Sequence, residues 1–414
     1  MQQVLVIGYV WPEPNSSAAG TRMLQLLKLF RSQDWKVTFA CPAVKGEFCY
    51  DLRQMDIASK TIQINDPSFD EFIKKMKPTI VLFDRFMMEE QFGWRVTEHC
   101  PNALRILDTE DLHSLRKARH QALKDGNDFH IDQLKRYNLA QREIASILRC
   151  DISLLISEIE HDILINDFKI DASLLVYIPF MVEKLSEEHI ATLPRFEERQ
   201  HFVTIGNFLH APNRDLVEYL KKDVWPILRK KLPKAEMHVY GSYAKEHNLQ
   251  LNQPKERFYV KGRADSAAEV ISKARIVLAP LRFGAGLKGK FIDGMQNGTP
   301  CVTSSIGAEG MHGDFPWNGI ISDDIETLVT ETVTLYTDKN RWLQAQQDGF
   351  VILENRYQKE QFQQQLLGKI KNTQTHLETH RIQNFFGNLL QLHNTKSTKY
   401  MSLWIEQKNK NSEQ

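Results

Sequence analysis

The chain has 414 residues, of which 42% are hydrophobic, so it is long enough to form two or three domains with hydrophobic cores and is not disordered. Its 53 lysine and arginine residues balance 52 aspartate and glutamate residues, which gives no indication of a nucleic-acid partner. If the protein binds a phosphate group, a few nearby basic residues must bind it, because the chain as a whole has almost no net charge.

Five cysteines are spread along the chain without a C-x-x-C pair, and no histidines cluster at the spacing of metal ligands. We therefore expect neither a metal site nor a disulfide framework, and a reducing cytoplasm fits best. The amino terminus leads directly into an apolar run without a signal-peptide pattern, and no apolar run reaches membrane-spanning length. If the protein acts at a membrane, we expect it to associate with the membrane surface without spanning the bilayer.

The first residues predict a Rossmann-like opening. Residues 4–10 form an apolar, β-rich run, residues 22–33 carry apolar side chains at helical spacing, and residues 35–42 form a second strand. The loop after the first strand lacks the G-x-G-x-x-G pattern of a dinucleotide site, so a NAD-dependent enzyme is disfavoured.

Three further strands are expected at residues 61–64, 80–84 and 103–107, with helices between them. The alternation predicts a parallel sheet covered on both faces, with ligands at the carboxyl ends of its strands. At one such end stands the run Asp-Thr-Glu-Asp-Leu-His. His113 in this run could bond a sugar hydroxyl or stabilise developing charge. Alternatively, Asp111 caps the next helix and His113 lies on its first turn.

A polar segment, residues 181–200, separates this series of strands and helices from a second one and is expected to be the interdomain linker. We place the first Rossmann-like domain at residues 1–185 and the second at residues 200–340. A group of helices that braces the first domain is placed at residues 341–393, and a polar tail at residues 394–414.

The most informative stretch covers residues 276–311. A short apolar strand feeds a loop that holds glycines and basic residues, namely Arg282, Gly284, Gly286, Lys288, Gly289 and Lys290. Glycines let the backbone approach a ligand, and the helix that follows points its free N–H groups at the same place, so the loop predicts an anion site. Asp293, about one turn inside the helix, is placed to accept hydrogen bonds from ribose hydroxyls. The segment therefore predicts a site for a nucleoside diphosphate.

The same segment resembles the donor-binding signature of the family 4 (group 1) nucleotide-sugar glycosyltransferases. The run from Asp293 to Val302, D-G-M-Q-N-G-T-P-C-V, matches the family's E-A-M-A-x-G-x-P-V-V, with aspartate in place of the second motif glutamate. The first motif glutamate is replaced by Ala285, so recognition of the donor sugar must be arranged differently here. The resemblance implies the α/β GT-B fold, in which two Rossmann-like domains face each other and a terminal helix crosses back to the first.

The resemblance also implies roles for residues outside this segment. His113 would face the donor sugar, and Gly20, in a small-residue loop after the first strand, would face the donor phosphates. Gly206 matches a strand-end glycine of the donor domain. Asn213 and Arg214 stand where the family has a basic residue that binds donor phosphate, so Arg214 is expected to take that role.

The function that follows is transfer of a hexose-type sugar from a nucleoside diphosphate sugar to a glycan or lipid-linked acceptor. The resemblance implies retention at the anomeric carbon and a setting in bacterial surface polysaccharide synthesis. The sequence has no D-x-D motif, so we expect no metal cofactor, and basic side chains would stabilise the departing diphosphate. The residues expected to act in catalysis are His113, Lys288 and Arg214. The residues expected to bind the donor are Gly20, Gly206, Asn213, Gly284, Gly286, Lys290, Asp293 and Glu309.

Two other functions stay open. A nucleotide-sugar epimerase of the same fold would use the same pocket and convert the donor without any acceptor. A protein that binds nucleotide sugars without catalysis is the second alternative, because the first motif acid is lost at Ala285.

The tail mixes lysines with Tyr400, Met401 and Trp404. One interpretation is an amphipathic helix that associates with the inner face of the cytoplasmic membrane. The favoured interpretation is a helix whose apolar face docks on the protein itself.

Overall fold

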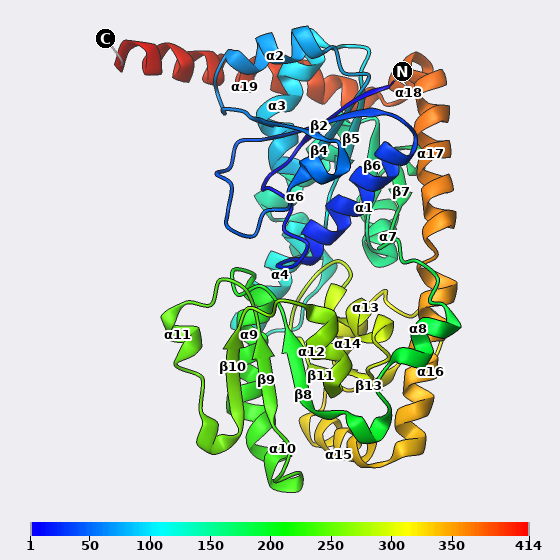
Figure 1. The fold of residues 1–414 in the computed structure, drawn as a ribbon. Coiled ribbons are helices and arrows are strands. Elements are labelled where there is room, and N and C mark those ends of the chain that lie inside the picture. Colours follow the sequence, from blue (N-terminus) through cyan, green and yellow to red (C-terminus); the bar gives the residue numbers. More distant parts are fainter. Residues whose placement is uncertain (1, 413–414) are drawn as a thin grey trace.

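The chain forms two α/β domains, one above the other in Figure 1, each built around a parallel sheet. The structure, a computed structural model, describes residues 2–412, with the side chains of residues 393–396 and 412 left aside. Residues 413–414, at the end of the predicted polar tail, lie outside the described residues. Among the described residues, no helix combines the length and the apolar composition needed to cross a membrane.

The first domain has seven parallel strands in the order β3-β2-β1-β4-β5-β6-β7. The strands are β1 Gln3–Ile7, β2 Lys36–Cys41, β3 Ala58–Thr61, β4 Ile80–Asp84, β5 Leu104–Asp108, β6 Ile152–Leu155 and β7 Leu175–Tyr177. The central strands are apolar and buried, as a parallel sheet between two helix layers requires. The exposed edge strand β3 lies three residues before the run predicted at residues 61–64, because pairing with β2 rather than hydropathy sets its position.

The second domain has six parallel strands in the order β10-β9-β8-β11-β12-β13. The strands are β8 Gln200–Ile205, β9 Met237–Tyr240, β10 Phe258–Gly262, β11 Ala274–Ala279, β12 Cys301–Thr303 and β13 Gly319–Ile321. In both sheets the chain starts at a central strand, builds outward to one edge and then returns to build the other side. The switch points lie between β1 and β4 and between β8 and β11, and such points hold the ligands of doubly wound folds.

Helices cover both faces of each sheet. In the first domain they are α1 Ala18–Ser32, α2 Ser68–Met76, α3 Phe86–His99, α4 His113–Lys124, α5 Ile131–Lys135, α6 Asn138–Arg149 and α7 Glu158–Asn166. The linker holds α8 Glu187–Thr192, and the second domain has α9 Ala211–Tyr219, α10 Trp225–Lys231, α11 Glu246–Leu249, α12 Ala267–Lys273, α13 Gly289–Gln296, α14 Ser305–Ala308 and α15 Ile325–Thr337. Between α9 and α10 the helix widens into a π-helical turn before Pro226, whose ring disfavours a regular turn.

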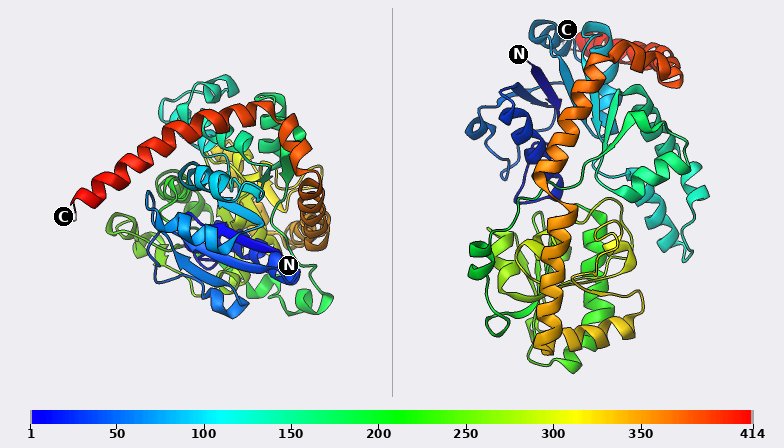
Figure 2. Two further views of the ribbon diagram at one scale, coloured as in Figure 1. Left: turned by 90° about the horizontal axis from the view of Figure 1, so that it is seen from above. Right: turned by 90° about the vertical axis from the view of Figure 1, so that its right-hand side faces the viewer.

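Two long helices join the domains. α16 Lys339–Arg356 packs on the second domain, α17 Lys359–Thr375 runs along the first, and they follow one another along one side of the molecule (Figure 2, right). Trp342 is buried in the core of the second domain, whereas Leu366 and Ile370 are buried in the core of the first. The predicted helix that crosses back to the first domain is therefore confirmed.

The chain passes between the domains at two points that lie side by side. Val182, where the chain leaves the first domain, forms a parallel bridge with Gln358, which stands between α16 and α17. The N–H of Val182 donates to the carbonyl of Tyr357 at 2.8 Å, and the N–H of Lys359 donates to the carbonyl of Val182 at 3.0 Å. The two crossings are thus held together by backbone hydrogen bonds.

The last helices are α18 Leu377–Gln383 and α19 Phe385–Ser412, and α19 lies across α3 and α6 at the far end of the first domain (Figure 2, left). The face of α19 that docks on the protein is polar. Ser402 and Glu406 both accept hydrogen bonds from the fully buried Arg95.

The expectation that the tail docks through its apolar face is wrong. Most apolar side chains of α19 are exposed, among them Phe385, Phe386, Leu389, Leu392, Tyr400, Met401 and Trp404. A buried guanidinium needs hydrogen-bond acceptors, so Arg95 selects the polar face of α19 as its cover.

We expect Leu366→Ala to lower the free energy of unfolding by about 2–5 kcal/mol, because the truncation leaves a cavity between α17 and the first domain. Urea unfolding followed by circular dichroism measures the loss. Gln364→Ala, on the exposed face of the same helix, is the matched control and should change the free energy by less than about 0.5 kcal/mol. Equal effects of the two substitutions would contradict a bracing role for α17.

Candidate functional site

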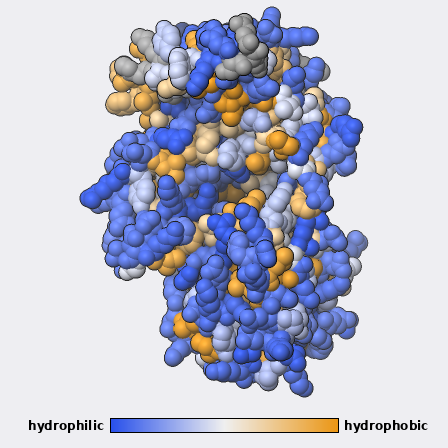
Figure 3. Space-filling model, turned by 90° about the vertical axis from the view of Figure 1, so that its left-hand side faces the viewer, coloured by the Kyte–Doolittle hydropathy of each residue, from blue (hydrophilic) through white to orange (hydrophobic). Residues whose placement is uncertain are grey.

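The seam between the two domains collects the amino ends of helices from both sheets. α1 follows β1, α4 follows β5 and α13 follows β11, all at the carboxyl ends of their strands. A Cβ atom at Gly289 would lie 2.7 Å from the Cβ of Ala18, and one at Gly286 would lie 2.9 Å from the Cβ of Asp111. Figure 3 shows the surface hollowed about midway along the molecule, where the domains meet. Helix amino ends carry partial positive charge, so the seam favours an anion.

The start of α13 is a helix end without a side-chain cap. Its N-cap residue is Lys288, whose side chain makes no capping hydrogen bond, and its first turn has no acidic residue. Within the described part of the chain, no acceptor is recorded for the N–H groups of Gly289 and Lys290. Gly286 turns the loop with a φ of 63°, which residues with side chains rarely adopt. The glycine loop therefore leaves the first N–H groups of α13 open to a ligand.

Two lysine side chains lie beside this helix end, of which Lys288 is buried and Lys290 is half-buried. Lys288 Nζ donates to the carbonyl of Gly286 at 2.8 Å, and Lys290 Nζ donates to Asn213 Oδ1 at 2.9 Å. Neither lysine forms an ion pair with a carboxylate of residues 2–412. Burial lowers the pKa of Lys288 to about 8 and that of Lys290 to about 7. A bound anion would raise both pKa values and offset the cost of burying the two charges.

Asp293 lies one turn into α13 and is half-buried. Burial raises the pKa of Asp293 to about 7, and among the described residues no hydrogen bond to its carboxylate is recorded. Ala285, at the position of the missing motif acid, packs against an apolar cluster of the first domain that includes Leu112 and Leu115. A carboxylate at position 285 would lie against these side chains, so packing between the domains accounts for the alanine.

Asn213 connects Gly206 with Lys290. A Cβ atom at Gly206 would lie 2.6 Å from the side chain of Asn213, whose Oδ1 accepts the hydrogen bond from Lys290. Arg214 points elsewhere, because its Nη1 donates to the carbonyls of residues 208–209 at 2.9 and 2.8 Å. The structure therefore brings Gly206, Asn213 and Lys290 together and leaves Arg214 bonded to its own loop.

His113 begins α4 on the other side of the seam. Its Nε2 lies 3.4 Å from Asp111 Oδ1, and its ring packs edge-on against Phe86. Burial lowers the pKa of His113 to about 4, so the ring is neutral at pH 7 and can donate or accept a hydrogen bond. Asp111 is paired with Arg116, and His210 of the second domain lies close enough to interact with this pair. His210 was not among the residues expected from the sequence.

Glu143 of α6, not Asp111, caps α4. Its carboxylate oxygens accept hydrogen bonds from the N–H groups of His113 at 2.7 Å and Ser114 at 2.8 Å. The alternative interpretation of Asp111 as the helix cap is therefore wrong, and Asp111 remains free to pair with Arg116. A cap that comes from a separate helix leaves no local pattern in the sequence.

Arg119 of α4 reaches across the seam to two residues that we expected to bind the donor. Its Nη1 donates to Glu309 Oε2 at 2.7 Å and to the carbonyl of Gly284 at 3.0 Å, and its Nη2 donates to Glu309 Oε1 at 2.6 Å. Two parallel bonds between a guanidinium and a carboxylate form a strong, oriented pair. Glu309 is thus engaged in holding the domains together.

Glu160 of α7 is a second link across the seam that the sequence analysis missed. Its Oε1 accepts hydrogen bonds from the N–H of Gly286 at 2.7 Å and from the N–H of Leu112 at 3.2 Å. Its Oε2 is buried and has no partner among the described residues. Burial, and then the nearby Asp111, raise the pKa of Glu160 to about 8. One carboxyl group therefore joins the glycine loop to the start of α4.

Gly20 lies inside α1 and packs on the loop before it. A Cβ atom at Gly20 would lie 2.5 Å from the backbone of Glu13, and the N–H of Gly20 donates to the capping Ser17 Oγ at 3.0 Å. The same loop contacts the second domain through Glu13, whose carboxylate accepts a hydrogen bond from Tyr243 Oη at 2.8 Å. Gly20 therefore allows this loop to fold closely onto α1.

Sequence comparison finds a family match within the second domain. Residues 199–338 match the model of the group 1 glycosyl transferases, which covers β8 to β13 and the glycine loop. Among curated protein sequences, none matches the chain. The match supports a group 1 glycosyltransferase, and its range contains Gly206, Asn213, Lys288, Lys290 and Asp293.

Solved structures share the fold over nearly the whole chain. A TarM mutant from S. aureus, in complex with fondaparinux, alpha-GlcNAc-glycerol and UDP, matches 89% of this chain and 99% of its own with a TM-score of 0.67 at 11% identity. Sucrose-phosphate synthase from Thermosynechococcus elongatus matches 90% and 99% with a TM-score of 0.65 at 15% identity. Anabaena HepE, in complex with UDP and glucose, matches 90% and 100% with a TM-score of 0.63 at 13% identity. The expected GT-B fold is confirmed.

Glu160→Gln should stabilise the protein increasingly as the pH rises from about 4.5 to about 8. In this window the unfolded chain has lost the proton of Glu160, whereas the folded chain still holds it because its pKa is raised, so the wild type loses stability as the pH rises. Glutamine stays neutral in both states and keeps the acceptor for both N–H groups. Below pH 4.5 the carboxyl is protonated in both the folded and the unfolded chain, so the advantage of glutamine is constant there.

Melting temperatures of both proteins between pH 4 and 9 measure this difference. The exposed Glu246→Gln is the control and should differ from the wild type by the same small amount at every pH. A difference for Glu160→Gln that does not change with pH would contradict a buried, protonated carboxyl at the seam.

Proposed function

We propose that the chain transfers a hexose-type sugar from a nucleoside diphosphate sugar to a glycan or lipid-linked acceptor, with retention and without a metal ion. The GT-B fold and the group 1 match of residues 199–338 support sugar transfer. The proposed setting is bacterial surface polysaccharide synthesis in the cytoplasm.

One observation carries the proposal: two lysines flank the uncapped start of α13. Open N–H groups of the helix lie beside the buried Lys288 and the half-buried Lys290, and neither lysine has a carboxylate partner among the described residues. Buried charge without a partner is costly, so the site favours a multivalent anion. A diphosphate supplies two phosphate groups for two lysines and a helix end.

The proposed roles follow from this anion. Lys288 and Lys290 hold the diphosphate and stabilise its charge as the bond to the sugar breaks. Asp293, whose carboxylate is open to a ligand, accepts hydrogen bonds from the ribose hydroxyls. Neutral His113 bonds a hydroxyl of the donor sugar from the opposite domain. Arg214 also binds the diphosphate, once its side chain has broken its hydrogen bonds to the two loop carbonyls.

Lys288→Ala should lower kcat for release of UDP from a UDP-sugar by about 10²–10³-fold, because it removes charge stabilisation from the departing diphosphate. UDP is the first nucleotide to test, since TarM and HepE were solved with it. Lys255→Ala, at an exposed lysine of the same domain, is the matched control and should leave kcat unchanged. Unchanged turnover in a folded Lys288→Ala protein would remove this lysine from the site.

Incubation with and without an acceptor separates the proposal from its alternatives. A glycosyltransferase releases UDP and moves the sugar to a supplied glycan or lipid-linked sugar. An epimerase changes the sugar on the intact donor when no acceptor is present. A binding protein takes up the UDP-sugar in calorimetry and releases no UDP under either condition. Either of the last two results would overturn sugar transfer.

We further propose that the exposed apolar face of α19 associates with an anionic membrane surface. Tyr400 and Trp404 are both more than half exposed on this face. In sequence, α19 carries four lysines against a single glutamate, Glu406, which is paired with Arg95. Exposed aromatic side chains beside lysines are typical of helices that lie in the interface of anionic lipids. This face would place the chain beside a lipid-linked acceptor.

Replacing both Tyr400 and Trp404 by serine should lower binding to vesicles that contain phosphatidylglycerol by roughly tenfold, since each aromatic ring buries apolar area in the bilayer. Flotation assays measure the bound fraction, and added salt should weaken wild-type binding. Leu249→Ser, at an exposed leucine of the second domain, is the control. Membrane association would be overturned if the wild-type chain did not bind the vesicles. It would also be overturned if the wild type formed a dimer that the double substitution dissociates.

A further inference from the structure

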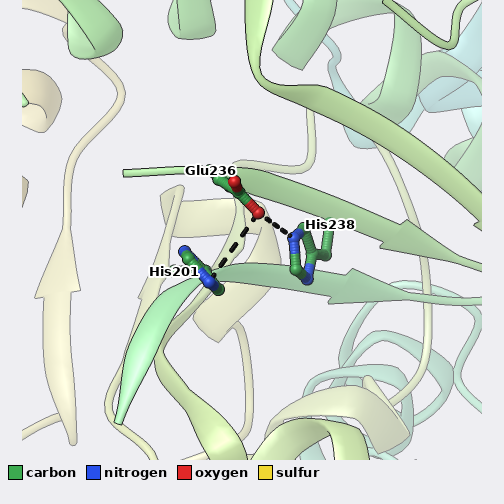
Figure 4. Close-up of side chains that lie close together, drawn as sticks. All are labelled: His201, Glu236 and His238. Atoms are coloured by element: carbon green, nitrogen blue, oxygen red, sulfur yellow. Dashed lines mark hydrogen bonds and ion pairs between the residues drawn. The ribbon is translucent and has the colours of Figure 1, made fainter. Parts of the chain in front are cut away.

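Two histidines and a glutamate meet at the end of the second sheet that faces away from the seam (Figure 4). His201 is near the start of β8, His238 is in the neighbouring β9, and Glu236 directly precedes β9. β8 runs from this cluster to Gly206, so the cluster lies roughly 16 Å from the donor loops at the rise of an extended strand. The cluster therefore belongs to a different site from the proposed sugar transfer.

The three side chains point toward one another. Glu236 Oε2 lies 2.8 Å from His238 Nε2 and 3.7 Å from His201 Nε2, and the centroids of the two imidazole rings are 4.8 Å apart. One nitrogen or oxygen atom from each residue lies within 4.8 Å of the other two. Ligands of a tetrahedral zinc ion are roughly 3.3 Å apart at metal–nitrogen distances of about 2.0 Å. Small side-chain rotations would bring these three atoms to that spacing.

The backbone holds the three residues in place. His201 adopts a φ of 66°, and its N–H donates to Tyr336 Oη at 3.2 Å. The carbonyl of Glu236 accepts a hydrogen bond from the N–H of Phe202 at 2.8 Å, and β8 and β9 are paired in parallel next to it. A positive φ is uncommon for a residue with a side chain and persists where its surroundings enforce it. The cluster is therefore set in a rigid part of the sheet rather than in a loop.

The donor atoms suit a transition metal. Two imidazole nitrogens and one carboxylate oxygen are the protein ligands of zinc in many three-ligand sites, whereas Mg²⁺ and Ca²⁺ prefer oxygen alone. The side chains of His201, Glu236 and His238 are 29%, 24% and 18% exposed, so solvent can supply a further ligand.

Arg257 and Tyr259 also contact this cluster. Arg257 Nη1 lies 3.7 Å from Glu236 Oε1, the carboxylate oxygen that does not face the histidines. Tyr259 packs edge-on against His238 from β10. Arg257 can therefore keep its contact with Oε1 while Oε2 binds a cation, so the carboxylate serves both partners.

We propose that His201, Glu236 and His238 bind one divalent transition-metal ion of the zinc class, with water completing its coordination. The ion ties β8 to β9 at the point where the chain enters the second domain. Its role is to stabilise this domain, because the site is remote from the seam. Local sequence patterns hardly reveal this site, because only Glu236 and His238 are close in sequence, as a Glu-x-His pair, and His201 comes from the neighbouring strand β8.

Calorimetric titration of the full chain with ZnCl₂, followed by thermal unfolding, tests the proposal. The wild type should bind one ion per chain with a raised melting temperature. Glu236→Gln, His238→Ala and His201→Ala should each weaken binding at least tenfold. His247→Ala, at an exposed histidine of the same domain, is the matched control and should bind as tightly as the wild type. Circular dichroism of each variant without metal confirms its fold.

The proposal is overturned by three results. Wild-type chain that binds no zinc at millimolar concentration excludes the site. If all three variants bind zinc as tightly as the wild type, the ion is bound by other residues. Equal loss of binding in the control would indicate scattered, adventitious ions. Should one alanine variant fail to fold, the isosteric Glu236→Gln decides, since it retains the shape and the hydrogen bond but loses the carboxylate charge.

Discussion

Helix amino ends from both domains converge on one seam, and the need to satisfy their N–H groups organises the structure around it. Ser17 caps α1, Glu143 caps α4, and Glu160 accepts hydrogen bonds from the N–H groups of Leu112 and Gly286, so side chains of the protein satisfy these groups. The start of α13 differs, because its N–H groups are flanked by lysines instead of acids. The proposed donor site therefore differs from the rest of the seam, because basic side chains and no acidic ones lie in the first turn of α13.

The same seam shows how closure of the domains and binding of a donor are related. Arg119 donates hydrogen bonds to Gly284 and Glu309, and Glu160 accepts one from Gly286. The first domain therefore contacts the glycine loop directly. A ligand at α13 therefore contacts a loop whose shape depends on the position of both domains. Lys288 of the loop is buried in this arrangement, so an anion bound beside it would stabilise the contact between the domains.

Local patterns in the sequence predict the strands and the glycine loop, because each depends on hydropathy or on neighbouring residues. The apolar runs of β1 and β4 are examples. The crossing helix was expected from the family resemblance. Contacts between distant residues could not be predicted in this way. Arg119 and Gly284 are 165 positions apart, and the polar docking of α19 depends on the burial of Arg95, which no local pattern reveals. The histidine cluster was missed for the same reason, since two strands contribute to it.

The paired crossings at Val182 and Gln358 have a mechanical consequence. Sliding of one domain past the other would break both backbone hydrogen bonds between the crossings, whereas a swing about them would keep both intact. The pair thus acts as a hinge on the side of α16 and α17. The largest separation on swinging open falls on the opposite side, where α11 lies in Figure 1. The hydrogen bond between Tyr243 and Glu13, just ahead of α11, lies on that side and would have to break for the domains to separate there.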